Sequence, residues 1–119
     1  MIWVMITIAV IVIVFLIINI VDMNRFTVRK YRVESEKIKA PCTIVFLSDL
    51  HDKSYGRRNA KLIREIDEIG PDLVLCGGDM IVASPGKKNE NAIALVKDLA
   101  EKYPMFYAFG NHEYRAELY

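Results

Sequence analysis

The chain begins with a long run of apolar residues, and shorter apolar runs recur further along. Residues 2–21 are apolar apart from Thr7 and Asn19, and none of them is charged. About 20 helical residues span the hydrocarbon core of a bilayer, and a backbone exposed to lipid must satisfy its hydrogen bonds within the helix. This pattern predicts a transmembrane anchor over residues 1–21.

A cleaved signal peptide is the alternative for this segment. No Lys or Arg precedes the apolar run, and no small-x-small cleavage site follows it. The run is also longer than the roughly 7–15 apolar residues of a signal-peptide core. We therefore expect the segment to remain attached as a single-pass anchor.

Residues 22–42 are more polar and carry an excess of positive charge. The basic residues are Arg25, Arg29, Lys30, Arg32, Lys37 and Lys39. By the positive-inside rule, this excess places the part of the chain after the anchor in the cytoplasm. We expect a juxtamembrane linker, either a solvated spacer or a segment that contacts anionic headgroups. Alternating apolar residues within 26–38 predict a short edge strand in this linker.

From residue 43 onward, strand-like and helix-like patterns alternate. Continuous apolar runs occupy residues 43–47, 72–76 and 105–109, and the first is typical of a strand buried on both faces. Apolar residues recur at helical spacing from Asn59, a candidate helix cap, to Gly70-Pro71, and again over residues 92–99. The order strand–helix–strand–helix–strand predicts an α/β fold with a parallel βαβαβ unit over residues 43–119.

Polar residues follow each predicted strand. Asp49 and His51 follow the first strand, Asp79 follows the second after two glycines, and Asn111 and His112 follow the third. The carboxyl ends of parallel strands meet at one edge of the sheet, where ligands bind in open α/β folds. We therefore expect these five side chains to converge. Carboxylate, imidazole and amide donors suit Mn, Fe, Zn or Mg.

Each of these motifs is weak by itself, and the specific signal is the trio at three strand ends. The neighbouring polar residues have two interpretations each. Glu113 either contacts a loop backbone or faces solvent. Asp52 and Lys53 either flank the site or, as we favour, belong to a solvated loop. Arg57 and Arg58 either meet a phosphate or only open a helix.

Length, charge and cysteine content limit the classes of protein to which this chain could belong. The 119 residues suffice for one small domain after the anchor. A formal net charge of +1 gives no basic field that would favour nucleic acid. Cys42 and Cys76 do not make a disulfide framework; Cys76 lies in an apolar run and is expected to be a small buried residue. A reducing compartment fits this usage.

The strings SDLH, GGD and GNHE resemble the motif blocks of the calcineurin-like metallophosphoesterases, above all the membrane-anchored bacterial branch. The resemblance covers roughly residues 43–115. It implies a β-sandwich flanked by helices and phosphoester hydrolysis with two divalent metal ions. It also implies that Asp49 and His51 bind one metal, Asp79 bridges both, Asn111 binds the second, and His112 acts on the leaving group.

The chain also departs from the family pattern. The family supplies further metal-binding histidines from later blocks, whereas this sequence contains two histidines, both already assigned. Only about one sheet of the two-sheet sandwich is expected. We therefore interpret residues 43–119 as the N-terminal part of a metallophosphoesterase domain, and we expect this chain alone to be inactive.

The predicted function is that of a membrane-tethered, metal-dependent phosphoester hydrolase. In the complete site, a hydroxide would attack phosphorus and His112 would stabilise or protonate the departing alkoxide. A lipid-linked or nucleotide-sugar phosphoester suits a site held near a bilayer. One alternative is a non-catalytic tethered fragment or pseudoenzyme. Another is a nucleic-acid phosphodiesterase, against which the near-neutral charge and the anchor both argue.

Overall fold

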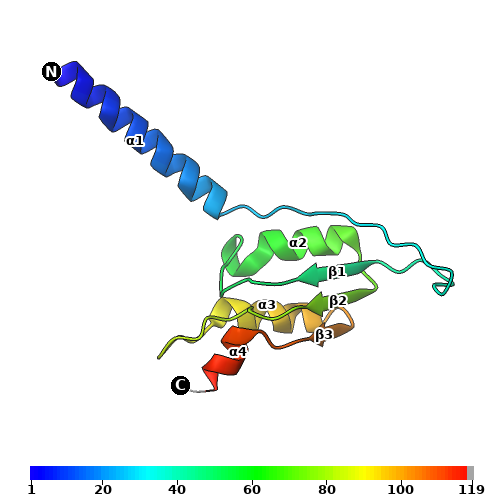
Figure 1. The fold of residues 1–119 in the computed structure, drawn as a ribbon. Coiled ribbons are helices and arrows are strands. Elements are labelled where there is room, and N and C mark those ends of the chain that lie inside the picture. The colour runs from blue at the N-terminus through cyan, green and yellow to red at the C-terminus, as the bar shows by residue number, and fades with distance from the viewer. Residues whose placement is uncertain (118–119) are drawn as a thin grey trace. The chain divides into compact units, whose positions relative to one another are not determined.

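The computed structural model describes residues 1–117, which divide into two compact units, Met1–Tyr31 and the chain from Arg32 onward (Figure 1). In the first unit, helix α1 (Ile2–Met23) is long and apolar enough to cross a membrane. Both of its central polar side chains are satisfied within the helix. Thr7 Oγ1 donates to the Trp3 carbonyl at 2.9 Å, and Asn19 Nδ2 donates to the Phe15 carbonyl at 2.7 Å. Such internal bonds make these residues compatible with lipid.

The edge strand expected within residues 26–38 is not formed. All of these residues belong to the described part of the chain, and they contain no strand. Their apolar residues come in two pairs with a slip between them, so the two pairs do not share one face of an extended chain. Tyr31 and Val33 are exposed, so this alternation reflects no buried face.

The second unit is built on a three-stranded parallel sheet, as predicted. The strands are β1 (Ile44–Leu47), β2 (Leu73–Cys76) and β3 (Met105–Tyr107), in the order β1-β2-β3. Ile44 pairs with Leu73, and Leu75 pairs with Phe106. All three strands therefore deliver their carboxyl ends to the same edge of the sheet.

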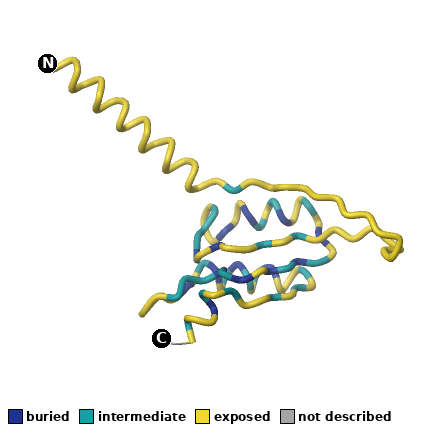
Figure 2. The backbone as a smooth tube through the Cα atoms, viewed as in Figure 1, coloured by how far each residue is buried: buried dark blue, intermediate teal, exposed yellow. Residues whose placement is uncertain are grey.

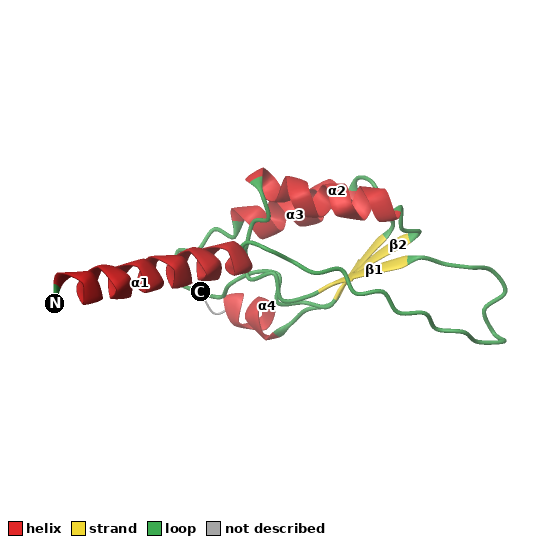
Figure 3. Cartoon of the chain, turned by 90° about the horizontal axis from the view of Figure 1, so that it is seen from above, coloured by secondary structure: helices red, strands yellow, loops and turns green. Residues whose placement is uncertain are grey.

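Two helices connect these strands and lie on the same side of the sheet (Figure 3). After the short 3₁₀ turn η1 (Arg57–Asn59), α2 (Ala60–Ile69) ends at Gly70, whose left-handed backbone donates to the Ile66 carbonyl at 3.0 Å. Helix α3 (Glu90–Ala100) buries Leu95 and Leu99. These lengths fit right-handed crossovers between neighbouring parallel strands.

Asn59 precedes α2 as predicted, but its side chain bonds elsewhere than the first turn of the helix. Its Oδ1 accepts from the backbone of Tyr55 at 2.9 Å, and its Nδ2 donates to the carbonyl of Asn91 at 3.3 Å. Asn59 is fully buried. It therefore joins the start of α2 to the start of α3, and this link replaces the expected capping bond.

The two faces of the sheet differ in burial, because more buried and more exposed residues alternate along each strand; Figure 2 colours each residue by its burial. On the helix-covered face, Val74 is fully buried and Cys76 nearly so, and burial together with the nearby Glu113 raises the pKa of the Cys76 thiol to about 11. On the other face, Phe46 is 65% exposed and Phe106 is 67% exposed. The expectation that β1 is buried on both faces is therefore wrong for this chain, because the two crossover helices cover one face alone.

Candidate functional site

Three of the predicted site residues lie in the left-handed backbone region. Asp49, His51 and Asp79 have φ values of 57°, 49° and 53°. Non-glycine residues adopt this region uncommonly, although Asp and His tolerate it better than most. Strained backbone of this kind clusters at functional sites, where the surrounding structure holds it in place. The two loops that follow β1 and β2 therefore share a local geometry typical of binding sites.

Those two loops are also hydrogen-bonded to each other beyond the ends of the strands. The Asp49 N–H donates to the Gly78 carbonyl at 3.1 Å, and the His51 N–H donates to the Asp79 carbonyl at 3.1 Å. These bonds continue the pairing of β1 with β2 into irregular backbone. They hold the first cluster of predicted site residues, Asp49 and His51, next to the second, Asp79; Asn111 and His112 form the third.

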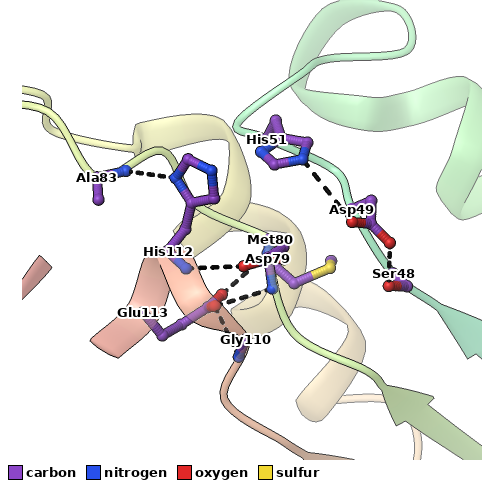
Figure 4. A network of polar contacts seen from close by, with 9 residues as sticks. All are labelled: Ser48, Asp49, His51, Asp79, Met80, Ala83, Gly110, His112 and Glu113. Atoms are coloured by element: carbon purple, nitrogen blue, oxygen red, sulfur yellow. Dashed lines mark hydrogen bonds and ion pairs between the residues drawn. The ribbon is translucent and has the colours of Figure 1, made fainter. Parts of the chain in front are cut away.

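The third cluster meets the second at the carboxylate of Asp79 (Figure 4). Helix α4 (Asn111–Ala116) begins at this point, and the backbone N–H of His112 donates to Asp79 Oδ1 at 2.8 Å. With its side-chain amide turned so that the nitrogen faces the carboxylate, Asn111 donates to Oδ2 at 2.6 Å and to Oδ1 at 3.0 Å. The opposite orientation of the amide presents its oxygen, the metal-binding atom, at the same place.

The first cluster reaches the third through its imidazole. The rings of His51 and His112 meet edge to face, with centroids 4.8 Å apart. On its other side, His51 Nε2 lies 3.8 Å from Asp49 Oδ1, and the Ser48 hydroxyl donates to Asp49 Oδ2. The side chains of Asp49 and His51 are 64% and 44% exposed, so this part of the site is open to solvent.

His112 has a fixed ring orientation. Its Nδ1 accepts a hydrogen bond from the Ala83 N–H at 3.0 Å. A neutral imidazole whose Nδ1 accepts carries its proton on Nε2. The bond therefore assigns the Nε2–H tautomer to His112 and leaves that N–H as its donor.

Glu113 contacts loop backbone, which was the first of its two interpretations. It is buried, and its carboxylate accepts from the backbone N–H groups of Asp79, Met80 and Gly110 and from the Tyr107 hydroxyl. Burial opposes the charge, but the Tyr107 hydroxyl and the backbone donors outweigh it and lower the pKa of Glu113 to about 2. Tyr107 is a site residue that the sequence did not suggest.

Asp52 is buried, so the solvated-loop interpretation favoured for it is wrong. Its Oδ1 accepts from the N–H groups of Asn91 and Ala92 at the start of α3, both at 3.0 Å. Its Oδ2 lies 2.7 Å from Lys87 Nζ. Burial raises the pKa of Asp52, but the Lys87 ion pair and the backbone donors outweigh it and hold the pKa below its usual value. Asp52 thus ties the first loop to α3.

The other flanking residues show no such integration. Lys53 Nζ lies over the ring of Tyr55, 5.3 Å from its centroid. Arg57 and Arg58 are exposed and form the turn η1 that precedes α2, which is the second of their two interpretations.

The donor types suit a divalent metal, but they form a partial set. Within residues 1–117, no three His, Cys, Asp or Glu side chains lie together closely enough to hold a metal ion. The donors instead form a pair, Asp49 with His51, and a cluster around Asp79 with Asn111 and His112. Oxygen and imidazole donors are those that Mn, Zn and Mg accept, so the residues fit such a metal in kind.

Comparisons with known proteins give a consistent result. A model of the family described as calcineurin-like phosphoesterase matches residues 42–119. The uncharacterized metallophosphoesterase Cj0846 of Campylobacter jejuni is 37% identical over 89 residues, which are 73% of this chain and 24% of the relative. The phosphodiesterase YaeI of Escherichia coli K12 is 35% identical over 78 residues, which are 62% of this chain and 28% of the relative.

No solved structure matches the chain. The chain spans about a quarter of the length of the curated relatives it matches.

Proposed function

The chain belongs to the calcineurin-like phosphoesterase family, and on that premise we propose that it contributes Asp49, His51, Asp79 and Asn111 as metal ligands and His112 as a catalytic residue to a phosphoester hydrolase. One observation carries the proposal: clusters that follow three separate strands are bonded to one another at one edge of the sheet. Asn111 and His112 contact the Asp79 carboxylate, and Asp49 and His51 are joined to the Asp79 loop by backbone hydrogen bonds. The βαβαβ unit brings them to the edge at which open α/β sheets bind ligands.

Each residue has a task in this proposal. Asp79 would bridge two cations, because a carboxylate at the junction can neutralise both. Asp49 and His51 would complete the first cation's ligands from this chain, and Asn111 would serve the second. When bound, divalent cations would supply charge for the phosphoryl oxygens and lower the pKa of a water molecule. The backbone N–H of His112 donates to Asp79 Oδ1, so the bridging carboxylate is oriented before a cation binds.

His112 would act on the leaving oxygen through Nε2. Because Nδ1 accepts from the Ala83 N–H, the ring offers its Nε2 proton and not its Nδ1 to a ligand. A hydrogen bond from Nε2 would stabilise the charge that develops on the departing oxygen. Full transfer of a proton would require a doubly protonated ring, and that form would have to give up the Ala83 bond.

We also propose that α1 anchors the protein in a membrane with the following residues in the cytoplasm. The uniform apolarity of α1 and its internally bonded polar residues support the anchor. The basic residues after it support the orientation. The substrate class proposed on this basis is a lipid-linked or nucleotide-sugar phosphoester, and a phosphodiester is a fitting first assay substrate because one relative bears that name.

Site variants in the complete protein test the hydrolase proposal. We expect Asp79→Asn to lose metal and nearly all activity, because the bridging charge is gone. We expect His112→Ala to keep most metal but to lose rate by about 10²–10⁴-fold, most strongly on substrates with poor leaving groups. Asp98→Asn on α3 is the matched control and should keep both. Metal analysis beside kinetics separates the roles, and loss of metal in His112→Ala but not in Asp79→Asn would refute them.

The same preparation distinguishes the rival functions. A nucleic-acid phosphodiesterase would cleave single-stranded DNA or RNA far faster than a small chromogenic phosphodiester. A non-catalytic protein would cleave neither, with or without Mn²⁺.

The anchor has its own test. We expect the protein to stay in the membrane fraction at full mass after a high-salt wash. Recovery of a soluble, shortened chain would refute the anchor. Digestion of residues 22–119 by protease added outside intact cells would reverse the orientation.

A further inference from the structure

We propose that Tyr107 and Glu113 form a positioning pair that sets the orientation of Asp79. The proposal rests on the proposed function in one respect, because it takes Asp79 to be a metal ligand. Neither member of the pair is a candidate ligand, and Tyr107 lies within β3 rather than in a strand-end loop. The role proposed for the pair is therefore separate from that of the five predicted site residues at the edge of the sheet.

The argument begins with the two loops that Glu113 joins. Its Oε2 accepts from the Asp79 N–H at 2.8 Å and from the Gly110 N–H at 2.9 Å. Its Oε1 accepts from the Met80 N–H at 2.9 Å. One carboxylate thus holds the backbone of the loop after β2 and the backbone that starts α4. A shift of this carboxylate would shift the backbone of Asp79 itself.

The two loops touch each other directly, which makes this arrangement sensitive to small displacements. A methyl group on Gly78 would overlap the backbone of Gly110, and one on Gly110 would overlap the side chain and backbone of Asp79. The His112 N–H bond to Asp79 Oδ1 depends on the same contact. Since the backbones are already at van der Waals distance, a small rotation of α4 would move the Asp79 carboxylate.

Tyr107 supplies the fourth donor, and it alone among the four is a side chain. Its hydroxyl donates to Glu113 Oε1 at 2.6 Å. Burial and the bond to the Glu113 carboxylate both raise the pKa of Tyr107, so the hydroxyl remains a donor throughout the neutral range. Without it, Oε1 keeps a single donor from Met80, and the carboxylate is held by its three backbone donors alone. The Asp79 amide and carboxylate would then be held less firmly in place.

The chain offers a matched control in a second tyrosine–carboxylate bond. The Tyr103 hydroxyl donates to Asp67 Oδ1 at 2.7 Å, between the segment after α3 and α2. Asp67 lies near the end of α2, shortly before β2 begins, and also pairs with Lys102. Tyr103→Phe therefore removes the same type of bond as Tyr107→Phe, but at a place where no candidate ligand depends on it.

The experiment compares both variants in the full chain in detergent, with amide hydrogen exchange and Mn²⁺ binding as separate readouts. A hydrogen bond to a charged group stabilises enough that we expect exchange of the Asp79 and Met80 amides to accelerate about 10-fold in Tyr107→Phe. We expect Mn²⁺ affinity to fall about 10-fold, as for other groups that orient a ligand. Tyr103→Phe should change neither by more than about 2-fold.

A double-mutant cycle with Glu113→Gln adds a test of the pair. The effects of Tyr107→Phe should largely vanish in the Glu113→Gln background, because the hydroxyl acts through that carboxylate. Unchanged exchange at Asp79 and Met80 in Tyr107→Phe, or equal effects in both backgrounds, would overturn the positioning pair. If exchange responds but the wild-type chain binds no Mn²⁺, the pair stands and the metal role of Asp79 fails. If Glu113→Gln does not fold, the exchange result in Tyr107→Phe decides.

Discussion

Two buried carboxylates, Asp52 and Glu113, organise the loops at the strand ends. Each accepts backbone N–H groups from a segment far away in the sequence, and each also binds one side chain, Lys87 or Tyr107. Buried charge is costly unless such partners satisfy it. These residues therefore shape the site without being candidates for contact with a substrate.

The Asp52–Lys87 pair gives a prediction at this scale. We expect Lys87→Met to lower the free energy of unfolding by about 1–2 kcal/mol at pH 7, because it leaves the buried Asp52 carboxylate without its cationic partner. This value is discounted because Lys87 is 44% exposed. The folded pKa of Asp52 is lowered, so the stabilisation is present above the usual value of 3.8 and is lost as the pH falls through the folded pKa.

Thermal melts between pH 7 and pH 2 check this expectation. The difference between wild type and Lys87→Met should shrink below about pH 4 and vanish once Asp52 is protonated. Lys88→Met is the matched control, because the Lys88 side chain is 82% exposed and should change stability little at any pH. A Lys87→Met deficit that persists unchanged at pH 2 would contradict the assignment.

The ends of the strands approach so closely that glycine is required at one position. Gly78 has φ +91°, and any side chain there would overlap the backbone of Gly110. Gly86 has a similar φ of +73°, but nothing lies within 4 Å of the place where its Cβ would be. The two positions share the backbone requirement and differ in the space around them.

Alanine substitutions separate the two effects. We expect Gly86→Ala to cost about 1 kcal/mol, from the left-handed backbone alone. We expect Gly78→Ala to cost at least about 3 kcal/mol, because two backbones must move apart. Urea unfolding monitored by circular dichroism measures both. Equal destabilisation by the two substitutions would mean that the close contact between the loops has no energetic importance.

Periodicity in the sequence predicts the elements that have a regular buried side. The apolar spacing in α2 and α3 follows the helical period, and the three strand runs are short, β-rich and bounded by turn residues. Helix α4 is too short for a period, and it starts where Glu113 bonds to Gly110, which depends on the fold of the loop around it. The expected edge strand failed because alternation alone does not supply a partner strand.

The candidate site, like the fold, could be predicted from the sequence only in part. Asp49, His51, Asp79, Asn111 and His112 could be predicted to approach one another because each follows a parallel strand, and topology alone brings strand ends together. The burial of Asp52 and the role of Tyr107 depend on contacts between segments that are far apart in sequence. Tyr107 pairs with Cys76 and so lies on the helix-facing side of the sheet, where its half-buried hydroxyl needs a partner, but the apolar run 105–109 does not single it out in the sequence.

At the scale of the whole second unit, the dominant feature is an apolar sheet face exposed to solvent. Ile44 and Phe46 on β1 continue across the sheet to Phe106 on β3, and all three are exposed. The Phe46 ring lies over Gly77, where a side chain would collide with it. Exposed apolar patches of this kind mark surfaces that associate with something else. A segment ending at residue 119 should therefore be poorly soluble by itself.

We therefore expect residues 22–119, expressed alone, to aggregate or pack loosely and to hydrolyse no phosphoester. These residues offer Asp49, His51 and Asp79 to one cation, and Asp79 with the weak amide oxygen of Asn111 to another. Water can complete the coordination, but it does not retain a metal against dilution. Calorimetric titration with Mn²⁺ should show at most one weakly bound equivalent, and a generic phosphodiester assay should show turnover equal to buffer.

A double substitution separates insolubility from the lack of ligands. Phe46→Ser with Phe106→Ser should improve the solubility of residues 22–119, because it removes the two largest exposed rings on the sheet face, and it should leave turnover at the level of buffer. If the soluble variant binds two equivalents of Mn²⁺ tightly and turns over substrate, the expectation of inactivity is wrong. Should a second copy of the chain supply the missing ligands, the activity would rise with the square of protein concentration at high dilution, where the dimer is the minor species. Activity that is instead strictly proportional to concentration would show that a single copy of these residues completes the site.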